Sequence, residues 1–150
     1  MIVALLLGRE GSVGFPGKNT TLVLGRPLMS YPLLAAIAAK SVDAVYVSTD
    51  SDNIKKVALE HGARIIERPP ELATKEALGE DAFVHGYRYI SNQLGASPEL
   101  MVLLFCNAST ILAKTIDEGV EVLLGDSSLD SAVTVSAYNM WSPIRARKQG

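Results

Sequence analysis

Short apolar runs alternate with helix-like stretches along the chain, and this alternation limits the fold more than any other feature. Residues 2–7 form a continuous apolar run, which is typical of a strand buried on both faces of a sheet. Later apolar runs have the same character, and Gly, Pro and helix-capping residues separate them from helix-like stretches. The expected strands are residues 2–7, 44–48, 63–67, 100–105 and 131–136. The expected helices are residues 33–39, 51–61, 80–93 and 115–124.

The β-α-β order predicts an α/β fold, a three-layer α/β/α sandwich with a mostly parallel, Rossmann-like sheet. The 150 residues suit one domain, expected to span residues 1–150, and a composition of 48 % apolar and 20 % charged residues indicates a globular chain. Ligands of such sheets bind beyond the carboxyl ends of the strands. We therefore expect the functional site in four segments, residues 8–19, 48–52, 67–73 and 106–112.

Charge, hydropathy and cysteine content exclude several classes of function. The net charge is −2 and no segment is strongly basic, which argues against a nucleic-acid partner. No apolar run approaches the ~20 residues that span a bilayer, and neither a basic region nor a cleavage site flanks the apolar start. We therefore expect no membrane partner and no signal peptide. Cys106 is the one cysteine, so we expect it to be buried packing in a protein of the reducing cytoplasm.

A glycine-rich loop follows the first expected strand. Four glycines recur at every third residue from Gly8 to Gly17, and glycine lets backbone N–H groups approach an anion closely. Arg9 and Lys18 add positive charge, so the loop predicts a cradle for a triphosphate. It matches neither a Walker P-loop, because Asn19 stands where a hydroxyl is required, nor the Rossmann fingerprint, because no two of these glycines are separated by one residue.

The loop and three later segments together resemble the acylneuraminate cytidylyltransferases, the CMP-sialic acid synthetases. Residues 7–19 read L-G-R-E-G-S-V-G-F-P-G-K-N, which is similar to the family's A-R-x-x-S-K-G-x-P-x-K-N. G-R-P-L at 25–28, V-S-T-D at 47–50 and R-P-P-E-L-A at 68–73 resemble the family's G-K-P-L, V-S-T-D and R-P-x-E-L-A. The motifs stand in the family's order, and the resemblance covers residues 2–136.

This resemblance implies a fold of the nucleotide-diphospho-sugar transferase type and a specific reaction. A sugar hydroxyl attacks the α-phosphate of CTP, which forms a CMP-sugar and releases pyrophosphate. The implied sugar is a sialic-acid-like 2-keto sugar acid or a related sugar. Mg²⁺ is the implied cofactor, although its ligands are not identified in this chain, and a homodimer is the implied assembly. The resemblance also implies that residues 1–150 are the N-terminal part of a longer domain of this type.

The resemblance also implies roles for individual residues. Lys18 and Arg9 are the expected catalytic residues, because phosphoryl transfer depends on positioning and on neutralising charge. Arg68 begins the segment that is expected to read the base. The expected nucleotide-binding residues are Arg9, Gly11, Ser12, Gly14, Lys18, Asn19, Arg68, Ala77 and Gly79.

Two departures from the family pattern keep other functions open. Val13 replaces a lysine of the loop, and the segment after the fourth strand replaces the family's Q-P-T-S-P-L-R with F-C-N-A-S-T-I. Ile111 therefore stands where an arginine would pair a sugar carboxylate. The polar candidates left for the sugar are Asn107, Ser109 and Thr110. The alternatives are a nucleotidyltransferase for GTP or UTP, and a catalytically silent module that binds a nucleotide or a sugar.

Overall fold

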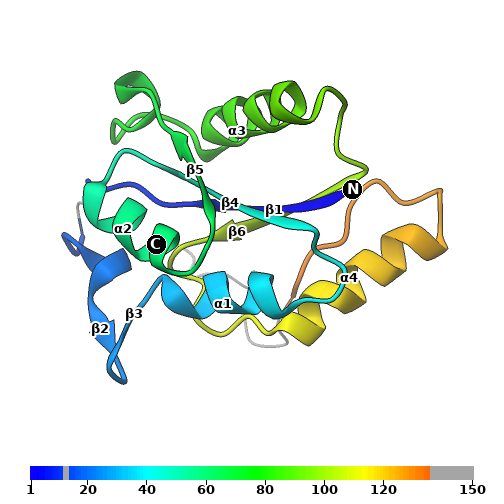
Figure 1. Ribbon diagram of the computed structural model, residues 1–150, viewed down its shortest axis with the longest axis horizontal. Helices are drawn as coiled ribbons and strands as arrows, with labels where there is room; N and C mark the ends of the chain where they lie inside the picture. Colours follow the sequence, from blue (N-terminus) through cyan, green and yellow to red (C-terminus); the bar gives the residue numbers. More distant parts are fainter. Residues whose placement is uncertain (12–13, 136–150) are drawn as a thin grey trace, which may run out of the picture.

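The computed structural model describes residues 1–11 and 14–135. Its centre is a parallel four-stranded sheet in the order β5-β4-β1-β6. The strands are β1 (Ile2–Leu7), β4 (Ala44–Thr49), β5 (Arg64–Glu67) and β6 (Leu100–Phe105). The helices are α1 (Ser30–Ala38), α2 (Asp52–Glu60), α3 (Gly79–Leu94) and α4 (Ala113–Gly125). Figure 1 shows α3 on one face of the sheet and α1, α2 and α4 on the other, which confirms the predicted α/β/α sandwich.

Strand β1 lies between β4 and β6 and supplies side chains to both faces of the sheet. Val3 and Leu5 pack in the core beneath α3, whereas Ala4 and Leu6 pack in the core shared with α1, α2 and α4. All four residues are fully buried. Helices cover both faces of the sheet at β1. For this reason the strand is apolar at every position and does not alternate between apolar and polar residues.

Four short elements were not predicted from the sequence, because two or three residues are too few to show a period of their own. They are the strands β2 (Leu22–Val23) and β3 (Arg26–Pro27) and the 3-10 helices η1 (Lys18–Thr20) and η2 (Pro70–Leu72). β2 and β3 form an antiparallel hairpin. Its turn has positive φ at two consecutive residues, Leu24 (50°) and Gly25 (80°). η1 closes the glycine-rich loop, and η2 follows β5, so both lie in segments expected to form the site.

The prediction of a fifth strand at residues 131–136 is wrong for the part that the structure describes. Residues 131–135 belong to neither of the sheets, and Val133 and Val135 are 78 % and 92 % exposed. Ser136 lies outside the described residues. Alternating valines favour a strand when one of their faces packs on a core. No described part of the chain covers these two side chains, so the pattern alone does not produce a strand.

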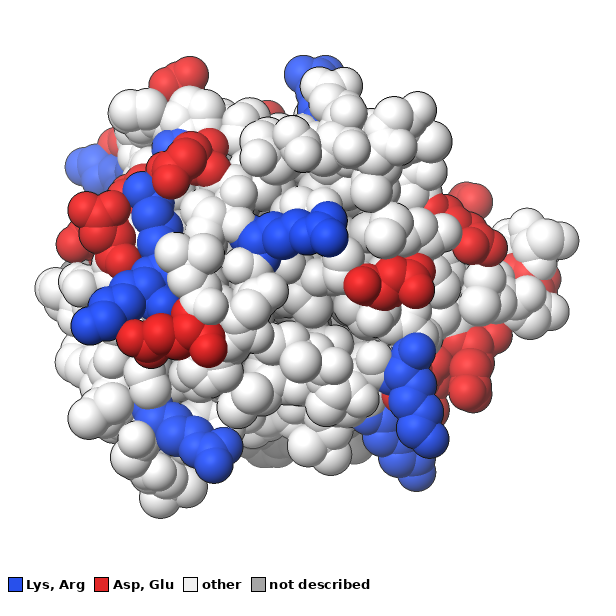
Figure 2. Space-filling model, viewed as in Figure 1, with Lys and Arg blue, Asp and Glu red and all other residues white. Residues whose placement is uncertain are grey.

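Positive and negative side chains are mixed over the surface. Figure 2 shows Lys and Arg interspersed with Asp and Glu on the face that it presents, without a continuous basic area there. One example is Lys55, which forms ion pairs with Asp52 (3.2 Å) and Glu67 (2.7 Å). Within the described ranges, no helix combines the length and the apolar character that crossing a membrane requires.

The packing of α3 on β1 can be tested at Gly86. A Cβ atom at this position would lie 2.5 Å from Cδ2 of Leu5, which is fully buried and cannot move away freely. We expect Gly86→Ala to destabilise the protein by about 1–3 kcal/mol, although alanine favours helix formation more than glycine does. Gly119→Ala in α4 is the control, because a Cβ there meets no atom within 4 Å. Urea unfolding should show the control at unchanged or higher stability; equal effects of both changes would contradict the close contact.

Candidate functional site

A cleft of about 460 Å³ opens at the carboxyl ends of the strands. Its walls come from the end of β1 and the glycine-rich loop, the segments after β5 and β6, and the start of α3. The lining residues are Leu7, Gly8, Arg9, Gly14, Phe15, Lys18, Asn19, Arg68, Leu72, Ala77, Leu78, Gly79, Ala82, Phe105 and Asn107. Among these described residues three are basic and none is acidic. A chain with a net charge of −2 therefore concentrates positive charge where parallel sheets bind their ligands.

The floor of the cleft is fixed where β1 ends. The Gly8 N–H donates to Ser48 O (3.2 Å), and the Cys106 N–H donates to Leu7 O (3.1 Å), so the loop leaves the sheet between β4 and β6. A Cβ atom at Gly8 would lie 2.5 Å from Sγ of Cys106, so this close approach requires glycine. Burial raises the pKa of the Cys106 thiol to about 12. The thiol therefore stays protonated at neutral pH and packs rather than acting as a nucleophile, as predicted.

Asn19 and Lys18 share η1 but have different surroundings. Asn19 is buried, and its side-chain Nδ2 donates to the backbone oxygen of Arg9 (3.3 Å). The backbone oxygen of Asn19 accepts a hydrogen bond from the Met29 N–H (2.8 Å). Asn19 therefore braces the loop from within. Lys18 is half-buried and lines the cleft, and the described residues offer no hydrogen-bond or ion-pair partner to its ammonium group. Lys18 thus carries a charge that is available to an anion.

Arg9 crosses from one wall of the cleft to the other. Its Nη1 donates to the backbone carbonyls of Ala73 (3.3 Å) and Thr74 (2.7 Å). These residues follow η2 and lead toward Ala77 and Gly79, which also line the cleft. The loop after β1 and the segment after β5 are therefore joined through one guanidinium group.

Arg68 directly follows β5, beside the carboxyl end of β4, and is only 8 % exposed. Its Nε donates to Ser48 Oγ (3.2 Å) and its Nη2 donates to Ser48 O (2.7 Å). Burial lowers the pKa of the guanidinium, the carboxylate of Asp50 opposes that change, and the charge of Arg9 adds to it. Arg68 therefore holds the end of β4, and it also brings into the cleft a positive charge that repels the charge of Arg9.

The structure brings most of the predicted site residues together, but not all of them. The cleft is lined by the predicted residues Arg9, Gly14, Lys18, Asn19, Arg68, Ala77, Gly79 and Asn107. Gly11, Ser109 and Thr110 are described but do not line it. Ser12 and Val13 lie outside the described residues. Ile111, which replaces the family's arginine, packs against the core shared with α1 and does not face the cleft.

Sequence reasoning missed the apolar part of the lining. Phe15, Leu78 and Phe105 are 56 %, 61 % and 49 % exposed although they are large and apolar. Binding pockets are lined mostly by such side chains, with a few polar groups that set orientation. Phe105 was the one signal in the sequence for this apolar lining. It is the last residue of β6, and ligands of parallel sheets bind beyond the carboxyl ends of the strands.

The described residues do not fit a resident magnesium site made by protein side chains. Among residues 1–11 and 14–135, no three His, Cys, Asp or Glu side chains are grouped closely enough to hold a metal ion. Asp50, at the end of β4, accepts a hydrogen bond from the Glu10 N–H (3.1 Å). A single carboxylate does not supply enough ligands to hold a metal ion by itself. Mg²⁺ often binds, however, through one or two carboxylates together with substrate phosphates.

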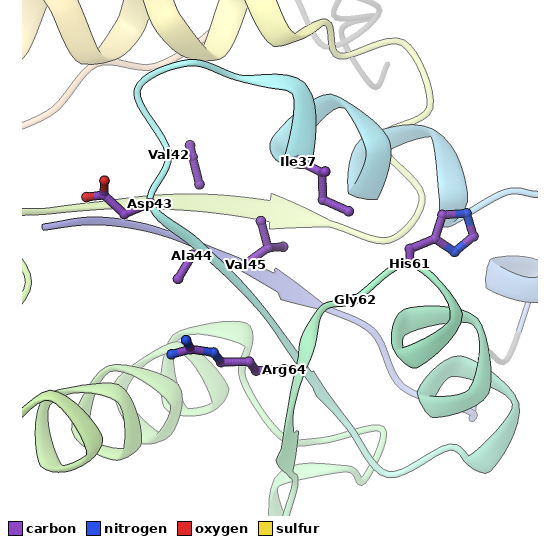
Figure 3. A pocket seen from close by; sticks show the side chains of 8 residues that line it. All are labelled: Ile37, Val42, Asp43, Ala44, Val45, His61, Gly62 and Arg64. Atoms are coloured by element: carbon purple, nitrogen blue, oxygen red, sulfur yellow. The ribbon is translucent and has the colours of Figure 1, made fainter.

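A second hollow, of about 240 Å³, lies at the amino end of β4 and β5 (Figure 3). Its polar groups are already engaged within the protein. Asp43 Oδ2 accepts the Ile2 N–H (2.7 Å), His61 Nδ1 lies 2.8 Å from Val57 O, and Arg64 Nη1 donates to the Tyr46 hydroxyl (2.7 Å). In Figure 3 the Asp43 carboxylate is turned away from Ile37 and Val45. The cleft at the carboxyl ends is therefore the candidate site.

A parallel α/β domain with a glycine-rich loop and converging cations at this edge is typical of the α/β proteins that bind phosphate-bearing ligands there. More specifically, the chain belongs to the cytidylyltransferase family, because the model of that family, described as "Cytidylyltransferase", matches residues 3–101. This confirms the family predicted from the four motifs.

Curated relatives agree with this assignment, and a solved structure agrees with the fold. N-acylneuraminate cytidylyltransferase of Oncorhynchus mykiss is 47 % identical over 72 residues, which are 48 % of this chain and 17 % of that protein. CMP-N,N'-diacetyllegionaminic acid synthase of Legionella pneumophila is 41 % identical over 64 residues, 43 % of this chain and 28 % of that protein. The fold matches that of CMP:2-keto-3-deoxy-manno-octonic acid synthetase complexed with CTP (TM-score 0.69, 21 % identity, 85 % of this chain and 49 % of that chain). The chain thus matches a minor part of the length of these relatives.

The close approach at the base of the loop gives a double-variant test. Gly8→Ala should destabilise the protein by about 1–3 kcal/mol, because the new methyl group meets the Cys106 sulfur. Cys106→Ala removes that sulfur, so the same Gly8→Ala change should cost less in the Cys106→Ala background. Urea unfolding of the wild type, both single variants and the double variant measures the coupling. If Gly8→Ala lowers the free energy of unfolding equally in both backgrounds, contact with the Cys106 sulfur is not what requires glycine at position 8.

Proposed function

We propose that this protein is a CTP-dependent nucleotidyltransferase that transfers CMP to the hydroxyl group of a sugar. The observation that carries the proposal is the cleft itself. In a member of the cytidylyltransferase family, three cations converge on the cleft and no acidic side chain among the described residues lines it. The alternatives with GTP or UTP, and a module that binds without catalysis, are separated from this proposal by the titration described below.

In the proposed reaction the sugar oxygen attacks the α-phosphorus of CTP. A new P–O bond forms as the bond from the α-phosphorus to the oxygen that bridges to the β-phosphate breaks. The electron pair of that bond leaves with pyrophosphate, and the proton of the sugar hydroxyl passes to water. Lys18 would stabilise the charge on the α-phosphate, and Arg9 would hold the triphosphate through its remaining N–H groups. The backbone N–H group of Gly14, which lines the cleft, would add a neutral donor. The ammonium group of Lys18 has no hydrogen-bond or ion-pair partner among the described residues, which supports its part in this scheme.

The nucleoside would occupy the side of the cleft formed by the segment after β5 and the start of α3. Arg68, Ala77 and Gly79 lie there, and Leu78 and Phe105 supply apolar surface for a ring. Each of these groups faces one cleft, which supports a ligand with both an anionic and a planar apolar part.

The acceptor is proposed to be a sialic-acid-like sugar or a related one. Two relatives, N-acylneuraminate cytidylyltransferase and CMP-N,N'-diacetyllegionaminic acid synthase, carry such sugars in their names. Asn107 is the polar group from the segment after β6 that lines the cleft. Because Ile111 is apolar and packs against the core, a sugar carboxylate would need a partner other than the side chain at that position.

Magnesium, the homodimer and the cytoplasmic location are part of the same proposal. Since the described residues form no cage, we expect Mg²⁺ to arrive on the triphosphate, where it would neutralise phosphate charge. Exposed Leu103 on β6 offers apolar surface to an assembly partner, which size measurement by light scattering tests. The single buried thiol of Cys106 suits a reducing compartment.

Titration calorimetry with CTP, UTP, GTP and ATP, with and without Mg²⁺, tests the proposal. We expect CTP with Mg²⁺ to bind tightest. Lys18→Ala should weaken CTP binding by about tenfold to a hundredfold, the range that corresponds to loss of one charge-assisted hydrogen bond. Lys56→Ala is the matched control, because Lys56 is an exposed residue of α2 and is not part of the cleft.

Each alternative has its own outcome in this experiment. If GTP or UTP binds more tightly than CTP, the substrate's base is guanine or uracil instead of cytosine. If CTP binds but no pyrophosphate is released when a sugar is supplied, the module that binds without catalysis is favoured. If none of the four nucleotides bound, the proposed function would be wrong.

A further inference from the structure

The segment from Ala73 to Leu78 is held to the rest of the fold through Arg9. Among the described residues, the two hydrogen bonds from Arg9 Nη1 are the ones that tie this segment to a part of the chain distant in sequence. The other bonds of the segment are local: Ala73 N–H to Pro70 O, Ala77 N–H to Thr74 Oγ1, and Ala82 N–H to Leu78 O. A segment with so few distant ties lies at the low end of local stability.

The Arg9 guanidinium has donors to spare. It carries five N–H groups, and the two on Nη1 serve the carbonyls of Ala73 and Thr74. The described residues offer no partner to Nε or Nη2. These two nitrogens form one edge of the planar group, which matches two oxygens of a phosphate. Arg9 can therefore bind an anion on one edge while it holds the segment with its other nitrogen.

The backbone of Arg9 is fixed at the same time. Its carbonyl accepts the buried Asn19 Nδ2 (3.3 Å), and Gly8 before it is bound to Ser48 of β4. The side chain thus extends from a rigid base to a weakly held segment. An anion that immobilises the guanidinium must then also restrict the segment that the guanidinium holds.

We propose that Arg9 is a positioning residue that couples the binding of phosphate groups to the ordering of residues 73–78. This inference deepens the proposed function and rests on it, because Ala77 and Leu78 line the part of the cleft assigned to the nucleoside. Phosphate binding through Arg9 places that wall before the base is recognised. Discrimination between bases therefore depends on Arg9, although Arg9 does not contact the base.

The experiment uses tripolyphosphate, which has the phosphate chain and no base. Amide hydrogen exchange is followed in the full chain with and without tripolyphosphate, and then with CTP. In the wild type, tripolyphosphate should slow exchange at residues 74–78 by about tenfold, the effect expected of one added charge-assisted hydrogen bond. The amide of Ala77, which Thr74 Oγ1 accepts at 3.1 Å, is the most direct reporter.

Arg9→Lys separates positioning from charge. The lysine keeps the positive charge, but its single ammonium group lacks the planar fork that serves two carbonyls and a phosphate together. The variant should bind tripolyphosphate, lose the slowing at residues 74–78 and lose part of the preference for CTP over UTP. Arg88→Lys, at an exposed position on α3 outside the cleft, should keep both effects.

The outcomes distinguish this coupling from the proposed function. If CTP and tripolyphosphate bind but exchange at residues 74–78 does not change in the wild type, the coupling is refuted and the proposed function stands. The same conclusion follows if Arg9→Lys binds tripolyphosphate and shows the wild-type slowing. If neither ligand binds to the wild type, the proposed function fails and the coupling fails with it. The wild-type measurement decides the matter even where the lysine variant is unstable.

Discussion

The whole site depends on the complete burial of β1 between two neighbouring strands. Alternate side chains of β1 fill the two cores, and its backbone is paired with β4 on one side and β6 on the other. A strand constrained in this way can leave the sheet at one place only, between Ser48 and Cys106. The glycine-rich loop starts at that point, so the packing of the apolar core sets the position of Arg9 and Lys18 relative to Arg68.

The fold was predictable because each buried strand and each helix had its own local pattern. The apolar run of β1 and the alternating order of elements were sufficient for the sandwich and its parallel sheet. The pattern failed at residues 131–135, where alternating valines lie exposed. A strand needs a neighbour, and the presence of a free neighbouring edge is a property of the tertiary structure rather than of the segment.

The site was predictable as far as its motifs reached. Lys18, Arg9 and Arg68 converge on one cleft because parallel strands deliver their following loops to the same edge of the sheet. What these arginines bind was not predictable. Arg9 donates to the carbonyls of residues 73 and 74, and Arg68 donates to Ser48, and a backbone carbonyl carries no sequence signal. Ser109 and Thr110 were predicted because of their polarity, but neither of them lines the cleft.

The electrostatics of the cleft explain why it should take an anion. Burial disfavours the charged form of Arg68, and the neighbouring charge of Arg9 disfavours it further, while Asp50 compensates in part. Lys18 adds a third cation without a partner among the described residues. Such an arrangement lowers the stability of the empty protein, because like charges approach one another in a partly buried space. A bound polyphosphate removes that repulsion, so the same charges that oppose folding favour binding.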